Sequence, residues 1–121
     1  AGPQYKAIGT VKEIMVGIMA PASNSLFGAA AELPTKDEDW LTVEHNTLLV
    51  AEMPNLLMLP GRTNTDPRWR MWVQRLRTNS EAALKAVKSR NGDMISAAGD
   101  KVYETCEGCH MIFLPENQQK K

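Results

Sequence analysis

The sequence has only two cysteines and two histidines in 121 residues, and it carries no net charge. Because its 14 basic residues equal its 14 acidic ones, nothing suggests a nucleic-acid or membrane-surface partner. No apolar run approaches the roughly 20 residues needed to cross a bilayer, so we expect no membrane span. Strand signals are nearly absent too, since apolar and polar residues show no sustained alternation. These absences favour a helical, globular chain.

A length of 121 residues allows one domain with a single core, and punctuation residues divide it into four helical segments. The first is expected from about residue 4 to residue 31. Pro21 lies inside it and removes one backbone donor, so we expect a kink or a break there. Apolar residues at steps of three and four give this segment a single apolar face: Ile8, Val11, Met15, Ile18, Ala22 and Leu26.

The other helix starts are marked by capping signals. Thr35–Glu38 has the Ser/Thr-x-x-Glu form of a capping box and should start the second helix, which is disturbed at Pro54. Asp66-Pro67 provides an N-cap and a first-turn proline for the third helix. Asn91-Gly92 should end that helix, and Asp93 can cap the fourth. Four helices with short connections predict an all-α, antiparallel four-helix bundle, with residues 1–121 forming a single domain.

Both cysteines and one histidine lie within the five-residue stretch CEGCH, residues 106–110. The apolar stripe of the fourth helix leads into it: Ile95, Ala98, Val102, Cys106, Cys109, His110 and Phe113 follow at intervals of one, three or four residues. A dithiol built for exchange needs an accessible thiolate, commonly at a helix N-terminus, whereas this pair lies near a helix end. A zinc site needs four ligands, and only His45 remains as a further soft ligand.

Cys106-Glu107-Gly108-Cys109-His110 has the C-x-x-C-H form of the c-type haem attachment sequence. Residues three apart on a helix lie about 5–6 Å apart on one side, so both sulfurs can reach one porphyrin edge. The following imidazole is then directed at the iron, and Gly108 leaves room for the macrocycle. We therefore predict covalent haem c, with a dithiol as the alternative. Thioether formation implies export, and a start at Ala1 fits removal of a signal peptide, so a periplasmic location is expected.

Further stretches accompany this motif, namely TVKEIMVGIMAPASNSLF, LMLPGR, DPRW and AAGDKVYETCEGCHMIF. Together with a haem motif near the C-terminus of a four-helix chain, they resemble the cytochrome c-prime superfamily and its low-spin, methionine-ligated members. The resemblance implies that the first helix crosses the distal haem face. Met15 would then bind the iron opposite His110, so the predicted cofactor-binding residues are Cys106, Cys109, His110 and Met15. Packing of Met15 against the ring without ligation is the alternative.

Other residues are weaker candidates for the same site. Met19 is the substitute for Met15, whereas His45 is expected to be a solvated surface residue. Lys12 or Arg62 could neutralise a haem propionate. Three aromatic residues are expected in the core or along the haem: Trp69, Trp72 and Tyr103.

Two functions of different classes follow from this prediction. A His/Met-ligated haem cycles between ferric and ferrous iron with little ligand rearrangement, which predicts an electron carrier acting between redox partner proteins. The rival is a five-coordinate, high-spin protein that binds small gases such as NO or CO. No enzyme is expected, because the sequence shows no nucleophile–base set, paired carboxylates or Gly-rich phosphate loop. Relatives often dimerise through their first two helices, which leaves a homodimer open.

Overall fold

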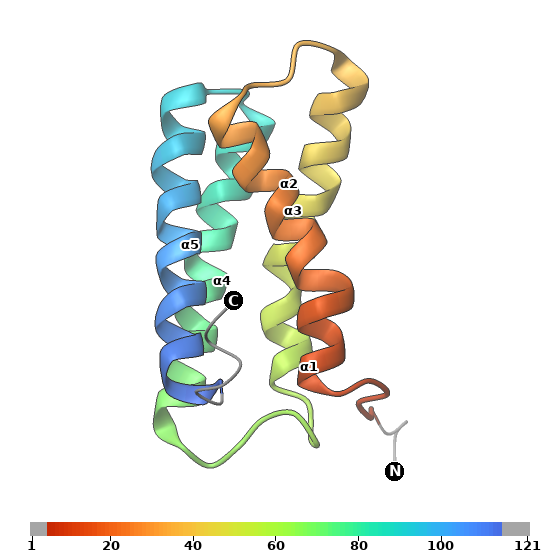
Figure 1. Cartoon of the computed structure of the whole chain (residues 1–121), viewed down its shortest axis with the longest axis vertical. Helices are drawn as coiled ribbons and strands as arrows, with labels where there is room; N and C mark the ends of the chain where they lie inside the picture. The colour runs from red at the N-terminus through yellow and green to blue at the C-terminus, as the bar shows by residue number, and fades with distance from the viewer. Residues whose placement is uncertain (1–4, 115–121) are drawn as a thin grey trace.

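The structure is a computed structural model that describes residues 5–114, and its regular elements within that range are all helical. Consecutive helices run in opposite directions and pack as a four-helix bundle (Figure 1). The expected all-α architecture is confirmed. The first helix, Val11–Ala31, is composed of α1 (Val11–Ile14), η1 (Met15–Met19) and α2 (Ala20–Ala31); the others are α3 (Asp37–Leu57), α4 (Pro67–Lys88) and α5 (Gly92–Phe113).

The first helix begins at Val11, later than its apolar pattern suggests, because Thr10 caps it. The Thr10 hydroxyl accepts a hydrogen bond from the Glu13 backbone N–H at 3.1 Å, and the Glu13 carboxylate accepts one from the Thr10 N–H at 2.9 Å. This reciprocal pair is a capping box, and its hydrogen bonds lower the pKa of Glu13. Ile8 lies before the cap and is 86% exposed, so its assignment to the apolar face was wrong.

A π-helical turn, Met15–Met19, takes the place of the expected break at Pro21. The Ala20 N–H donates to the Met15 carbonyl five residues earlier, and Pro21 follows with no N–H to donate. A π turn adds one residue to the turn and so shifts the phase of the helix. Around this turn the buried residues are therefore Ile14 and Met19. Ile18 was predicted on the buried face, but it is 36% exposed.

Two of the other predicted helix signals also differ from the structure. Lys36, not Thr35, is the N-cap of α3, and no side chain caps that end. Pro54, where a disturbance was predicted, lies inside this helix, which ends at Leu57. α5 begins at Gly92, and its cap is Asn91, whose side chain accepts from the Met94 N–H at 3.1 Å. Asp93 lies in the first turn instead of at the cap.

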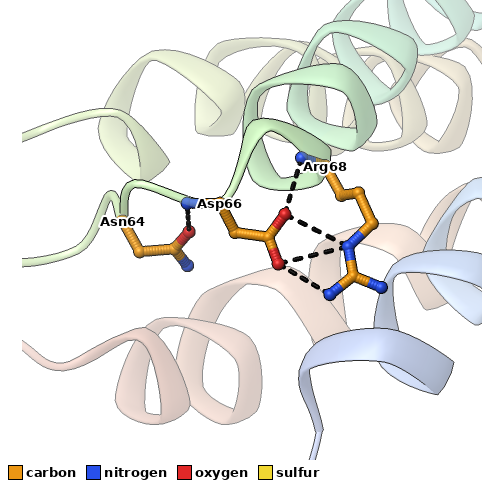
Figure 2. A network of polar contacts seen from close by, with 3 residues as sticks. All are labelled: Asn64, Asp66 and Arg68. Atoms are coloured by element: carbon orange, nitrogen blue, oxygen red, sulfur yellow. Dashed lines mark hydrogen bonds and ion pairs between the residues drawn. The ribbon is translucent and has the colours of Figure 1, made fainter.

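The start of α4 agrees with the prediction from Asp66-Pro67. The Asp66 carboxylate accepts a hydrogen bond from the Arg68 backbone N–H at 2.9 Å and also holds the Arg68 guanidinium, with Nη2 and Oδ2 2.7 Å apart (Figure 2). Asn64 in turn accepts from the Asp66 N–H at 2.9 Å. These bonds to Arg68 lower the pKa of Asp66. The capped end sets Arg68 over the ring of Phe113 on α5, with 5.9 Å between guanidinium carbon and ring centroid.

The core is formed by all four helices, with α4 packed between α3 and α5 and with α2 in contact with both α3 and α5. Its most buried large side chains include Leu26, Val50, Met53, Ile95 and Val102. At the Pro67 end of α4, the buried Trp69 indole donates to the Leu57 carbonyl at 3.2 Å.

The helix Val11–Ala31 is long and apolar enough to cross a membrane by length and composition, with a mean hydropathy of 1.4 in its most apolar window. We expected no such segment from the sequence. Only 33% of that window is buried in the bundle. A core helix of a bundle and a secretory leader both meet this criterion, so it assigns no location by itself.

Candidate functional site

The two cysteines lie within the last turns of α5, three residues apart on one side of the helix. Both are unpaired thiols and half-buried. Cys106 packs against the core cluster below the fully buried Val102, as the predicted apolar stripe requires. The pair is therefore held by regular helix on the side of α5 that faces the bundle.

Burial sets the ionisation of these thiols. It raises the pKa of Cys106 to about 11, with a further contribution from the nearby Cys109. Burial also raises the pKa of Cys109. At pH 7 only about one Cys106 thiol in ten thousand is then ionised. Because the thiolate is the nucleophile in exchange reactions, this environment disfavours the dithiol alternative.

His110 is exposed, although its place in the apolar stripe predicted a buried ring. Successive α-helical residues are rotated by about 100°, so His110 lies about 80° around α5 from Val102, whereas Cys106 lies only about 40° away. His110 is thus at the edge of the stripe, where a side chain is buried only if something packs over that edge. An imidazole in this position is accessible to a group attached at the neighbouring cysteines.

Gly108 faces the opposite side of α5, toward α4. A Cβ atom at this position would lie 2.3 Å from Cη2 and 2.6 Å from Cζ3 of the Trp72 indole. The space beside Gly108 is therefore occupied by Trp72. That this glycine makes room for a macrocycle stays a prediction; the close neighbour that the structure shows is an aromatic side chain of the protein itself.

Met15 and Met19 differ in their surroundings. Met15 is half-buried and packs against the core cluster, whereas Met19 is 4% exposed. Both belong to η1, which packs on α3.

The positions of the two methionines along the bundle axis can be compared with that of His110. The reference is the edge-to-face contact of Phe27 on α2 with Tyr103 on α5, whose ring centroids are 5.7 Å apart. At about 1.5 Å per residue, His110 lies about 10 Å beyond Tyr103 along α5. On the first helix, Met19 lies about 12 Å from Phe27 and Met15 about 18 Å. The position along the bundle axis therefore favours Met19 as the second iron ligand, whereas the greater exposure of Met15 favours Met15.

The weaker candidates have varied surroundings. His45 and Lys12 are both exposed, and for His45 this was the expectation. Arg62 donates to two backbone carbonyls, from Nε to Gly9 at 3.1 Å and from Nη1 to Leu56 at 3.1 Å. It thereby ties the segment before the first helix to the end of α3, which is a structural role that the sequence did not suggest.

The aromatic candidates divide between core and surface. Trp69 is in the core and meets Phe113 edge to face, with centroids 5.2 Å apart. Tyr103 is 52% exposed, and a hydrogen bond to Glu107 raises its pKa. Trp72 is half-buried between α4 and α5.

Surface grooves flank α4 in the described part of the chain, and two of them are not lined by Cys106, Cys109, His110 or Met15. One lies between α3 and α4 and includes Pro54, Met58 and Val73 in its lining. The other, of about 220 Å³, lies between α4 and α5 and is lined in part by Trp72 and Thr105. Among residues 5–114, no three His, Cys, Asp or Glu side chains gather in a way that could hold a metal ion.

The residues present fit a covalently attached haem. Two unpaired, half-buried thiols share one side of α5, and the next residue places an imidazole at the exposed edge of the same side. Protonated thiols are also the form in which cysteine lies stably in an apolar setting. The first helix contributes two thioethers, Met15 and Met19, as candidates for the second axial position.

The charges are segregated among the helices, which a net charge of zero conceals. α4 has six Lys or Arg residues and one acidic residue, whereas α3 has five acidic residues and no Lys or Arg. α5 has four acidic residues and one lysine. Four arginines lie in the half of α4 that packs beside the cysteine motif: Arg68, Arg70, Arg75 and Arg77. All four are exposed, with Arg68 and Arg75 on the α5 side of α4 and Arg70 and Arg77 on the α3 side, so the surface of this half of α4 is basic.

Sequence reasoning missed two of these features, although signals for both were present. The contact of Trp72 with Gly108 was signalled by a glycine inside a strongly helical segment, which often marks close packing. The basic surface was signalled by the density of arginine between residues 68 and 77. No protein-family model, curated protein or solved structure matches the chain.

Proposed function

We propose that this chain is an exported c-type cytochrome that carries single electrons. The observation that carries the proposal is the C-x-x-C-H motif of α5, whose two cysteines are unpaired, half-buried thiols on the bundle side of the helix. We also propose that the chain shares the low-spin haem and the periplasmic location of the cytochrome c-prime superfamily members that it resembles.

The chain's own residues would have separate tasks. The thiols of Cys106 and Cys109 would each add across a vinyl group, forming an S–C bond while the thiol proton goes to the terminal vinyl carbon, so no oxidant is needed. His110 would supply one axial nitrogen and Met15 a thioether on the other side. Haem bound in this way supplies reversible one-electron chemistry at iron, and the thioether ligand raises its reduction potential.

The rest of the bundle supports electron transfer by limiting rearrangement. The core around Cys106 is apolar and closely packed, with Val102 fully buried one turn away. Such surroundings keep solvent reorganisation small when the charge of the iron changes. No further acid or base is required for this function.

A gas-binding protein is the second candidate, and one observation favours it. Met15 lies about 8 Å farther along the bundle than His110, measured from the contact of Phe27 with Tyr103. If neither Met15 nor Met19 reached the iron, the distal position would be open to small diatomic gases. The two candidates differ in the coordination number of the iron.

The charge pattern supports a partner with an acidic docking surface. Arg68 and Arg75 lie beside the helix that would hold the haem, and Arg70 and Arg77 lie on the α3 side of the same half of α4. Complementary charge accelerates the encounter between redox proteins. A homodimer remains part of the proposal as well, because apolar side chains are exposed on the first helix and α3: Val16, Ile18, Leu41 and Leu48.

The experiment that tests the function is mass analysis and optical spectroscopy of the protein purified from a host with c-type maturation. We expect one haem per chain, no free thiol, and a low-spin ferric spectrum with a thioether-to-iron charge-transfer band. A high-spin spectrum with rapid CO uptake by the ferrous form would support the gas-binding candidate. A chain with two free thiols and no haem would refute both.

A further inference from the structure

Trp72 of α4 packs closely against Gly108 of α5, beside the cysteine motif. A methyl group at Gly108 would lie 2.3 Å from Cη2 of Trp72, far inside van der Waals contact. By comparison, a Cβ at Gly99, also on α5, would meet the Ala30 Cβ at an ordinary 3.6 Å. At Gly92, the first residue of α5, a Cβ would lie 2.9 Å from Cδ1 of Leu33, so Gly108 has the tightest surroundings of these three glycines.

The indole of Trp72 is held by packing. The Arg75 guanidinium lies over the ring, with 4.8 Å from Cζ to the ring centroid. Its buried Nε1 has no hydrogen-bond partner in the described structure. The edge of the six-membered ring meets Gly108 while its face carries Arg75, and its Nε1 has no polar anchor, so the position of the ring depends on the absence of a side chain at residue 108.

We propose that Trp72 is the positioning residue for the cysteine motif, and that Gly108 is required by Trp72 and not by the haem. Trp72 packs against one side of the helical turn from Cys106 to His110. On the opposite side of that turn, the two sulfurs face the bundle and the imidazole lies at the edge of the apolar stripe. Fixing the back of one helical turn fixes the direction of every side chain on it, because these residues span little more than one turn. The role in haem attachment depends on the proposed function, whereas the contact itself does not.

A double-mutant cycle tests the contact, using thermal unfolding of the protein as purified. Gly108→Ala should lower Tm by several degrees, since the methyl group must displace the indole or separate α4 from α5. In a Trp72→Ala background the same substitution should raise Tm, because alanine is the better helix former once the indole is gone. Gly99→Ala is the matched control and should raise Tm in either background.

Haem attachment tests the positioning role. The measured quantity is the fraction of chains that carry two thioether bonds, determined by mass analysis after proteolysis. We expect Trp72→Ala and Gly108→Ala each to lower this fraction severalfold, with one-thioether or haem-free chains in its place, and Trp72→Phe to restore most of it. Val73→Ala is the control for lost stability, because Val73 is a buried neighbour on α4 that is 4% exposed and should leave the fraction unchanged.

Each outcome decides between the two parts of the inference. Gly108→Ala lowering Tm equally in both backgrounds would refute the contact. A two-thioether fraction that Trp72→Ala leaves unchanged, or that Val73→Ala lowers as much, would refute the positioning role. A wild-type chain without haem would refute the proposed function and the positioning role together, while the stability cycle would still report on the contact.

Discussion

Met15 and Met19 are the two ends of one π turn, and only Met19 is inserted into the core, with 4% of its surface exposed. The turn exists because Pro21 follows it and the Ala20 N–H reaches back to the Met15 carbonyl. The extra residue places both thioethers near the bundle interior, one half-buried and one buried. The two methionines can therefore be distinguished by substitution.

Met15→Ala should convert the ferric spectrum from low-spin to high-spin and remove the thioether-to-iron charge-transfer band, because the axial sulfur is lost. Met19→Ala should leave the spectrum unchanged and lower the free energy of unfolding by about 2–5 kcal/mol, as expected for truncation of a buried methionine. Met94→Ala, at a 43% exposed position, is the control for both measurements. An unchanged spectrum for Met15→Ala together with a high-spin Met19→Ala would move the axial position to Met19.

The raised pKa of Cys106 predicts a pH dependence in the chain prepared without haem. Its folded-state pKa of about 11 exceeds the ordinary thiol value of 9.0, so the folded state retains a proton that the unfolded state loses. The corresponding stability is complete below pH 9 and is lost as pH rises through 11. Urea unfolding between pH 8 and 11 should show this decline, and Cys106→Ala should make it shallower.

The same thiols should alkylate slowly at neutral pH. The rate for Cys106, followed by mass analysis, should increase toward pH 11 as the thiolate forms. A midpoint below pH 8.5 would mean an activated thiol and would favour the dithiol alternative.

The cap of α4 predicts an effect at acidic pH. The pKa of Asp66 is lowered by the hydrogen bonds of Arg68, so this stabilisation is present above the unfolded-state pKa and is lost as pH falls through the lower folded-state value. Asp66→Asn should keep the cap to the Arg68 N–H but lose the ion pair. The variant should therefore be less stable at pH 7, and its free energy of unfolding should depend less on pH in the acidic range. Asp66→Ala should be less stable than Asp66→Asn at neutral pH. Equal stability of the two variants would contradict the capping role.

The basic surface of α4 predicts position-dependent electron-transfer kinetics. Arg70 and Lys88 are both exposed and lie five helical turns apart, so they share one face of α4 at about 27 Å. Arg70→Glu should slow oxidation of the ferrous protein by the hexacyanoferrate(III) anion by about two- to fivefold at about 0.1 M salt, where the Debye length is about 10 Å.

Lys88→Glu changes the net charge equally at the far end of α4 and should have little effect on that rate. Stopped-flow absorbance measures both variants. Equal slowing by the two would show that overall charge, and not the surface beside the cysteine motif, controls the reaction.

Much of the architecture was predictable because its signals are local. The apolar stripe of α5 through Ile95 and Val102, and the cap at Asp66-Pro67, depend on neighbouring residues of one helix, and both predictions are confirmed. Haem attachment at C-x-x-C-H and ligation by Met15 stay predictions from the motif and the resemblance. The capping box at Thr10 is equally local, but the apolar spacing of Ile8 predicts an earlier helix start, and the cap at Thr10 overrides that spacing.

By itself, the sequence determined that the chain is helical and that two thiols and an imidazole share one end of its last helix, because helix formation and the spacing of residues along a helix depend on near neighbours. Only the tertiary structure decided that Trp72 fills the space at Gly108, that His110 is exposed, and that α4 presents its arginines beside the motif. These features depend on which helices pack together and at what distance, and residues far apart in the chain determine that jointly.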